Sequence, residues 1–294
     1  MSVKANIHTL HTLRVNSVDI AYYEQGTGPL VICLHGFPDT ANSMQPLVET
    51  LAAAGYRAVA PFLRGYYPSA LAADGDYSLP TVARDIIALI EALYEGDDEP
   101  KAAVVGHDWG GLTAYHVANL CPQRVMSLTV MSVPHMHSAK LSWKQFKNGW
   151  YIMFFQIPWL PEKVIPRHQY RFIERLYRLW SPSWADNASH IDNFKQMAAH
   201  PGALAAILAY YRCMVGHATP EAKALIAQQT TVPALWFLGD EDGCVALDQV
   251  ENLDASFTKG VEFHLVKGAG HFPHCEKPAM VLPLIKDFIG RHVD

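Results

Sequence analysis

The hexapeptide Gly-His-Asp-Trp-Gly-Gly at 106–111 combines residue types that can support nucleophilic catalysis. It lies between a short apolar run at 102–105 and a helix-like segment, so we expect a turn from a strand to a helix. Small residues on both sides allow such a turn to be sharp and to project one side chain beside the free N–H groups of the helix. Asp108 occupies that position as a candidate nucleophile, and an ordinary helix N-cap is the alternative interpretation.

A second motif, His-Gly-Phe-Pro at 35–38, follows an apolar run at 30–34 that reads as a buried strand. The carboxyl ends of parallel strands meet at one edge of a sheet, so this turn is expected beside Asp108. The backbone N–H groups of Phe37 and Trp109 are then the natural pair to stabilise an oxyanion. Taken alone, so short a motif is also compatible with a plain loop.

A histidine is expected at the same edge. His271 lies in a Gly-flanked loop after the predicted strand at 261–266, and a catalytic base needs both reach and a pKa near neutrality. His264 and His274 are competitors, but the first lies within the strand and the second follows a proline.

Three consecutive acids, Asp240, Glu241 and Asp242, follow the predicted strand at 234–238. A carboxylate there could orient the imidazole of His271, and the residues alone leave open which of the three does so. A solvated acidic turn is the alternative for each. The chain order is nucleophile, acid, histidine, each at the end of a predicted strand, and this combination is more specific than any single motif.

The elements that must position these residues alternate along the chain. A hairpin at 9–25 precedes predicted strands at 30–34, 58–62, 102–105 and 125–133, with helices at 43–54, 81–94 and 113–120 between them. A strand, a helix, a strand and a closing helix follow at 234–238, 247–254, 261–266 and 279–292. This alternation predicts an α/β fold with a mostly parallel sheet and helices on both faces.

The alternation stops between residues 135 and 230, where aromatic residues at helical spacing replace the strand signals. We therefore expect a core formed by 1–134 and 231–294, interrupted by a helical cap at 135–230. Five of the seven tryptophans lie between Trp143 and Trp184. We expect them to pack the cap and to form an apolar roof over Asp108.

Composition excludes several classes of protein. Twenty-three basic against 28 acidic side chains give no support for nucleic-acid binding. Uncharged runs such as 148–161 and 196–211 are too short to cross a bilayer and contain proline, so no membrane span is expected. Five scattered cysteines favour a reducing, cytoplasmic setting. No cofactor and no metal is expected, because the histidines show no ligand spacing. A homodimer is left open.

With these motifs in this order, the chain resembles the α/β-hydrolase superfamily, and within it the soluble-type epoxide hydrolases, with haloalkane and haloacetate dehalogenases as close relatives. The resemblance covers nearly the whole chain and implies an eight-stranded, mostly parallel sheet with a cap inserted after the sixth strand. It implies Asp108 as nucleophile and His271 as base. The family pattern Gly-x-x-Asp after the seventh strand selects Asp242 as the acid. The segment 132–136 offers no acid for the arrangement of some dehalogenases.

A pair of cap tyrosines distinguishes epoxide hydrolases from these relatives. The segments 151–158 and 210–214 look like the two family segments, which makes Tyr151 and Tyr211 the expected pair that polarises the epoxide oxygen. Core packing is the alternative for both, and Tyr210 is the adjacent candidate. Trp109 does not discriminate, because haloalkane dehalogenases use a tryptophan there as a halide ligand. Positions 109–112 lack the arginines of haloacetate enzymes.

The resemblance also implies that His35, Pro38 and Trp109 line the substrate site. The sequence therefore predicts an epoxide hydrolase that converts a small apolar epoxide and water to a vicinal diol through an ester on Asp108. A haloalkane-type dehalogenase and a non-catalytic ligand-binding α/β-hydrolase remain as alternatives. An ordinary esterase is disfavoured because Asp replaces Ser.

Overall fold

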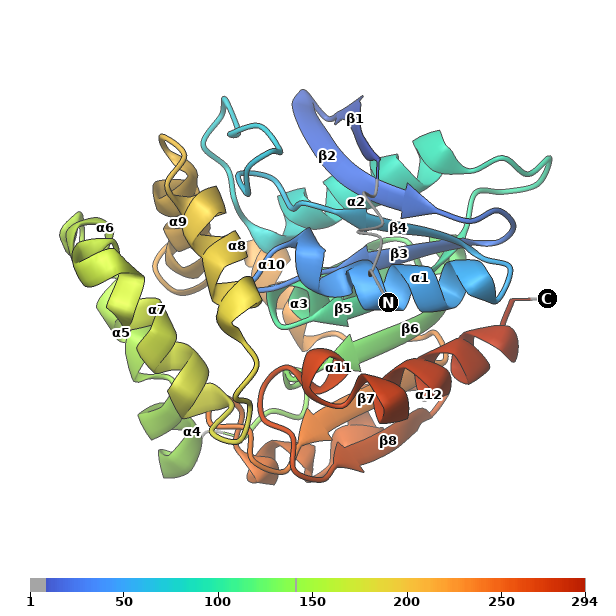
Figure 1. The fold of residues 1–294 in the computed structure, drawn as a ribbon. Helices are drawn as coiled ribbons and strands as arrows, with labels where there is room; N and C mark the ends of the chain where they lie inside the picture. The colour runs from blue at the N-terminus through green and yellow to red at the C-terminus, as the bar shows by residue number, and fades with distance from the viewer. Residues whose placement is uncertain (1–8, 141, 294) are drawn as a thin grey trace, which may run out of the picture.

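The structure, a computed structural model, describes residues 9–140 and 142–293 (Figure 1). Three parts of the predicted domains lie outside the described residues: 1–8 and 294 of the core, and 141 of the cap.

Eight strands form one sheet in the order β1-β2-β4-β3-β5-β6-β7-β8. They are β1 (Leu10–Val15), β2 (Val18–Gln25), β3 (Leu30–Leu34), β4 (Arg57–Pro61), β5 (Ala102–His107), β6 (Val125–Met131), β7 (Ala234–Gly239) and β8 (Val261–Val266). The hairpin β1-β2 is antiparallel and pairs antiparallel with β4, while the other neighbours are parallel. Strands β3, β5 and β7 are buried along their whole length, as expected for strands covered on both faces. The predicted mostly parallel α/β fold is confirmed.

Helices cover both faces of this sheet (Figure 1). Helices α1 (Gln45–Ala53), α11 (Pro273–Glu276) and α12 (Pro278–Gly290) pack together on one face. Helices α2 (Leu79–Leu93) and α3 (Trp109–Leu120) pack together on the other. Because βαβ crossovers carry the chain back over the sheet, the loops after the parallel strands gather at a single edge.

The helix predicted at 247–254 is wrong as a continuous element. Two short 3₁₀ helices, Leu247–Val250 and Leu253–Ser256, occupy that stretch. Glu251 is extended and Asn252 has a left-handed φ of 64°, so the backbone leaves the helical conformation between the two.

Between β6 and β7 the described residues form seven helices and no ladder strand. They are α4 (Trp143–Asn148), α5 (Trp150–Phe155), α6 (Leu160–Val164), α7 (Arg167–Trp180), α8 (Ala188–Ala198), α9 (Ala203–Val215) and α10 (Pro220–Ala227). Helices α8 and α9 lie between the sheet and helices α5 to α7, which are drawn in green to yellow-green at the left of Figure 1. Helix α4 lies lower, where Gln145 hydrogen-bonds the loop after β7. No helix within the described ranges is long and apolar enough to cross a membrane.

Most tryptophans of this helical segment are not buried in the way the sequence predicted. Trp143, Trp150 and Trp159 are exposed, with Trp143 retaining 79% of its surface. Trp180 is buried, and it packs against Phe37 and His271. The prediction of a tryptophan roof therefore fails for three of the five, because spacing along short helices did not reveal which face turns to the core.

Candidate active site

Asp108 lies in a sharp turn between β5 and α3. Its φ of 50° and ψ of −115° fall outside the conformations that non-glycine residues ordinarily adopt. The main chain around it is fixed, since its N–H donates to Met131 O at 3.1 Å and its carbonyl accepts from Leu112 N at 2.9 Å. Although Asp108 is the N-cap residue of α3, its carboxylate makes no capping hydrogen bond to that helix.

The Asp108 carboxylate instead faces the loop after β3. Phe37 N–H donates to Asp108 Oδ1 at 2.8 Å. Only a glycine fits at position 36, because a Cβ there would lie 2.5 Å from the Asp108 Cβ. One oxygen of Asp108 thus already occupies a backbone donor site of the kind that could hold an oxyanion.

Both ring nitrogens of His35 hold this loop. Nδ1–H donates to Gly36 O at 3.1 Å, and Nε2 accepts from Leu63 N at 3.2 Å. Burial lowers the pKa of His35 to about 4, so the ring is neutral. His35 therefore has no ring nitrogen free for a substrate and acts here on the shape of the loop, whose Phe37–Pro38 peptide is cis.

His271 lies between two carboxylates. Its Nε2 is 3.6 Å from Asp108 Oδ2, and its Nδ1 is 3.0 Å from Asp242 Oδ2. Burial alone lowers the pKa of His271, but the charges and hydrogen bonds of Asp242 and Asp108 outweigh burial and raise it to about 10. In this arrangement the imidazole carries a proton and bridges the two acids.

Of the three adjacent acids, Asp242 is the one that contacts His271. Its Oδ1 also accepts from the backbone N–H groups of Cys244 and Val245, at 2.7 and 2.9 Å. Asp240 accepts from Gly268 N instead, and Glu241 accepts from a serine hydroxyl. Three donors therefore fix the Asp242 carboxylate against the imidazole.

The competing histidines lie elsewhere. His264 is on β8 and stacks on Phe237, with ring centroids 5.4 Å apart. His274 lies in α11, where it is buried beside His107 of β5. The geometry thus brings His271, and neither competitor, against Asp108.

Tyr151 on α5 and Tyr211 on α9 lie with their rings 5.9 Å apart. Burial raises the pKa of Tyr211 well above its usual range, and the Asp108 charge is the next cause. Burial likewise raises the pKa of Tyr151, with Asp108 among the lesser causes. The Trp109 side chain is the one polar neighbour that lowers the pKa of Tyr211, and its contact does not meet the geometry of a regular hydrogen bond within the described residues. The Tyr151 hydroxyl is 3.3 Å from Cys244 Sγ. Both hydroxyls are protonated donors close to Asp108.

Tyr210 points elsewhere, because its hydroxyl donates to Arg64 O at 2.8 Å. On a helix, adjacent residues face about 100° apart. Of the two neighbouring tyrosines, Tyr211 is therefore the one whose hydroxyl is available near Asp108.

Aromatic rings enclose the site. Trp109 and Phe37 pack against Tyr211 with centroids 4.8 and 5.5 Å apart, and Trp180 packs against Tyr151 at 4.8 Å. The Asp108 side chain keeps only 12% of its surface. Charges in such an apolar enclosure interact far more strongly than in water.

Tyr66 is a residue near Asp108 that was not predicted from the sequence. Its buried hydroxyl has no partner among the described residues, and burial raises its pKa, with the Asp108 charge as the next cause. Its ring packs on those of His35 and Tyr210. Arg64-Gly65-Tyr66 follows β4 at the same sheet edge as the other motifs, which is the signal that could have identified it.

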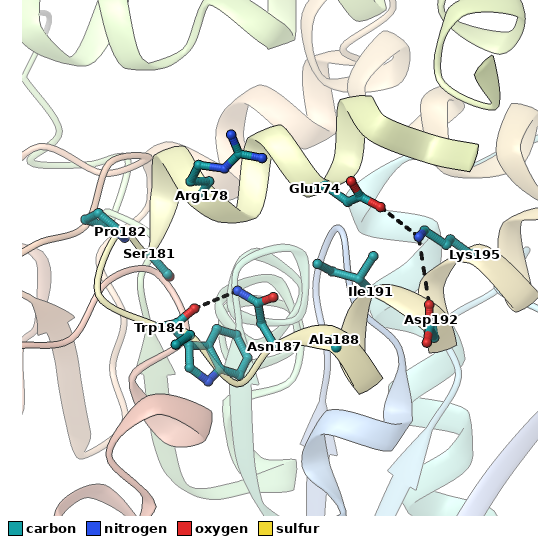
Figure 2. A pocket seen from close by; sticks show the side chains of 11 residues that line it. Glu174, Arg178, Ser181, Pro182, Trp184, Asn187, Ala188, Ile191, Asp192 and Lys195 are labelled. Carbon is teal, nitrogen blue, oxygen red and sulfur yellow. Dashed lines mark hydrogen bonds and ion pairs between the residues drawn. The ribbon is translucent and has the colours of Figure 1, made fainter. Parts of the chain in front are cut away.

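Ser181, at the end of α7, was also missed. Its hydroxyl accepts from His271 N at 2.9 Å and donates to Glu276 at 2.7 Å. The helical segment therefore positions the loop that carries the candidate base. A hollow of about 460 Å³ lies between α7 and α8 on the outer side of Ser181 (Figure 2). Asp108, His271 and the two tyrosines do not line it.

Within the described ranges, two groups of side chains have potential metal-ligating atoms close together. They are Asp242, Cys244 and His271, and separately Asp39, His274 and Cys275. In the first group, hydrogen bonds already engage Asp242 and His271 with each other.

Comparisons with known proteins agree with this geometry. A family model described as alpha/beta hydrolase fold matches residues 29–278. The AB hydrolase superfamily protein YfhM of Bacillus subtilis (strain 168) is 31% identical, over 98% of this chain and 96% of its own. Epoxide hydrolase 1 of Caenorhabditis elegans is 29% identical, over 95% of this chain and 70% of its own. The crystal structure of Epoxide Hydrolase A from Mycobacterium thermoresistibile superimposes with a TM-score of 0.84 at 24% identity, covering 98% of this chain and 99% of that one, a likeness of fold.

Proposed function

Since this chain belongs to the α/β-hydrolase fold family, we propose that it hydrolyses a small apolar epoxide to a vicinal diol through a covalent ester on Asp108. The observation that carries the proposal is the Asp108 carboxylate in the strained turn, 3.6 Å from the His271 imidazole. The similarity to the epoxide hydrolase of C. elegans supports the substrate class.

In the first step an Asp108 oxygen attacks an epoxide carbon, a C–O ester bond forms, and the ring C–O bond breaks. The electron pair of the broken bond goes to the epoxide oxygen, to which Tyr151 and Tyr211 donate hydrogen bonds or a proton. A carboxylate suits this step because it displaces at a saturated carbon without prior deprotonation. A serine would form an ether that water and a histidine could not cleave.

Esterification removes the Asp108 charge and with it one of the two anions that raise the pKa of His271. The imidazolium proton can then pass to the alkoxide, which becomes the new hydroxyl, or to the tyrosinate left when a tyrosine has protonated that alkoxide. Either route leaves His271 neutral. Charge and protons balance across the step, and the base is generated only when it is needed.

In the second step neutral His271, oriented by Asp242, takes a proton from water as the water attacks the Asp108 carbonyl carbon. The N–H groups of Phe37 and Trp109 hold the oxyanion. Collapse breaks the ester bond, and the leaving alkoxide takes the remaining proton of the added water. The diol leaves, and the Asp108 carboxylate and the His271 imidazolium are restored. Pro38 and Trp109 form part of the substrate wall, and His35 shapes that wall through its backbone bonds.

A haloalkane-type dehalogenase is the second candidate, because it would use the same Asp108 and His271. It needs halide donors in place of tyrosine hydroxyls. A ligand-binding protein without turnover would need neither the strained Asp108 nor the charge on His271, which weighs against that alternative.

The proposal is tested by measuring diol formation from styrene oxide and halide release from a bromoalkane, with the wild-type protein and the Tyr151→Phe/Tyr211→Phe double variant. Diol formation that the double variant loses supports an epoxide hydrolase. Halide release that the double variant keeps identifies a dehalogenase, and no turnover of either compound identifies a binding protein. Asp108→Asn, assayed before slow deamidation, must lose diol formation.

Three further parts of the proposal follow from sequence patterns. The helical segment at 135–230 is a cap on a core of 1–134 and 231–294, which the tyrosine positions support. The setting is cytoplasmic, in keeping with five free cysteines. A homodimer is not required, because every proposed site residue comes from one chain.

A further inference from the structure

The exposed side of helices α4 to α7 carries a cluster of large apolar side chains. Its members are Trp143, Phe146, Trp150, Met153 and Trp159. Trp143, Phe146 and Trp159 each keep about two thirds or more of their surface. Four of the five line a shallow hollow of about 890 Å³, whose rim includes Lys140 and Lys147. Folded chains rarely leave so many large apolar groups together in water without a use for them.

Basic side chains surround this cluster. Between residues 140 and 178 the chain has eight Lys and Arg against two Glu. The basic residues are Lys140, Lys144, Lys147, Lys163, Arg167, Arg171, Arg175 and Arg178. Segment 135–230 as a whole has 11 basic and 5 acidic residues, whereas the rest of the chain has 12 and 23. The positive charge of an acidic protein is therefore concentrated on this segment.

Most of these charges have no ion-pair partner. Glu162 pairs with Arg212, and Glu174 reaches across to Lys195 of α8, as Figure 2 shows. Lys140 pairs with Glu251. Over residues 9–140 and 142–293, none of the other seven basic residues has a carboxylate oxygen within 4 Å, although the charges of Lys144 and Asp248 interact.

We term the exposed apolar and basic groups of helices α4 to α7 the outer helical face. Phe172 of α7 packs on Trp150 of α5, with centroids 5.9 Å apart, and so joins the two helices. Lys163 lies over the Trp159 ring at 5.1 Å. Arg171, Arg175 and Arg178 recur at i, i+4 and i+7 on the regular part of α7, beyond the left-handed residues 168–170. In Figure 1 α5, α6 and α7 lie on the side of α8 and α9 away from the sheet.

We propose that the outer helical face docks on the surface of an anionic lipid bilayer. Exposed tryptophan and phenylalanine favour the headgroup level, where amphipathic rings are stabilised, and lysine and arginine are attracted to anionic headgroups. The basic side chains without ion-pair partners are complementary to the negative charge of the lipid headgroups. A second copy of the chain fits less well, because a symmetric contact would bring one basic rim against another. The site stands apart from Asp108 and does not depend on the proposed activity.

The test is co-sedimentation of the full chain with vesicles of phosphatidylcholine alone or mixed with phosphatidylglycerol. We expect binding to the mixed vesicles, weakened by salt, and little binding to phosphatidylcholine. The Arg171→Gln/Arg175→Gln/Arg178→Gln variant should lower the partition coefficient on the order of 100-fold, at roughly one kcal/mol per basic residue near the surface. The matched control, Lys259→Gln/Lys267→Gln/Lys277→Gln, removes the same total charge from another part of the chain. Because charges far from the contact are screened by salt, this control should change the partition coefficient less than about 3-fold.

A second variant tests the apolar part. Trp143→Ala/Phe146→Ala should lower partitioning about 10-fold or more while circular dichroism stays unchanged, because both side chains are exposed. Failure of the wild-type protein to bind mixed vesicles would overturn the proposal. So would equal losses in the arginine and control variants, since binding would then follow net charge alone. Two other results would also overturn the lipid proposal. Self-association that becomes stronger in the arginine variant would indicate a second copy of the chain as the partner, and tighter binding to duplex DNA than to vesicles would indicate a nucleic acid.

Discussion

The Asp108→Asn substitution should lower the pKa of His271 substantially while leaving the fold intact. In the structure the imidazole lies between Asp108 Oδ2 at 3.6 Å and Asp242 Oδ2 at 3.0 Å, and its pKa is raised to about 10. Asparagine keeps the shape of Asp108 and its hydrogen bond from Phe37 N–H, but removes the charge. The variant thus mimics the neutral ester that the proposed mechanism forms.

The size of the effect follows from the distance. Two unit charges 3.6 Å apart interact by about 4–5 kcal/mol at an effective dielectric constant of about 20. At 1.36 kcal/mol per pKa unit, this corresponds to roughly 3 units. Allowing for a hydrogen bond from imidazolium to the asparagine carbonyl, we expect a fall of about 2–3 units, to about 7–8.

The assay is NMR titration of ¹⁵N-histidine protein, with the His271 signals assigned by their loss in His271→Gln. Glu241→Gln is the matched control, because this exposed acid in the same turn contacts a serine and not His271. It should leave the pKa of His271 within a few tenths of a unit. If Asp108→Asn moves that pKa by less than about 0.5 unit, the Asp108 charge does not hold the imidazolium proton. The proposed generation of the base would then be wrong.

Further predictions concern the tyrosines, pH and a buried ion pair. Tyr211→Phe should lower the rate of ester formation about 100-fold in single-turnover stopped flow. Tyr210→Phe should leave that rate within a few fold, and equal losses would contradict the assignment. Because the pKa of His271 is raised from 6.5 to about 10 in the folded state, its stabilising contribution is complete below about pH 6.5 and is lost as pH rises toward 10. The free energy of urea unfolding should fall by up to about 1.4 kcal/mol per pH unit in that window, and His271→Gln should flatten this slope. Arg64→Leu should cost about 3–5 kcal/mol in urea unfolding, because it leaves the buried Asp85 carboxylate unpaired. A loss below about 1 kcal/mol would mean that water or other groups satisfy Asp85.

The sheet and the placement of Asp108, Asp242 and His271 could be predicted because they follow from local patterns. Buried strands read as short apolar runs, and the parallel arrangement brings the residues after each strand to one edge. The sharp turn at Asp108 requires small residues on both sides, and the glycines at 106, 110 and 111 are visible in the sequence. Selection of Asp242 rested on the family resemblance, and the structure adds the physical reason, three donors that fix this carboxylate.

Other features depend on packing that one sequence does not display. The position of Tyr66 after β4 places it at the active-site edge of the sheet, but only the packing of its ring on His35 and Tyr210 fixes where its hydroxyl lies. Trp143 and Trp159 could not be told from Trp180, because all three lie on short aromatic helices and only tertiary contacts decide which face is buried. The helix predicted at 247–254 is wrong because extended Glu251 ends one 3₁₀ helix and left-handed Asn252 begins the next.

The central claim is that an Asp108 oxygen enters the product. It is tested most directly by a single-turnover reaction of excess enzyme with styrene oxide in ¹⁸O-labelled water, followed by mass spectrometry of the diol. The covalent mechanism predicts that the first diol carries ¹⁶O from the enzyme and that the label appears in the Asp108 carboxylate. A first-turnover diol that carries ¹⁸O, with an unlabelled Asp108, would contradict it and indicate direct attack by water.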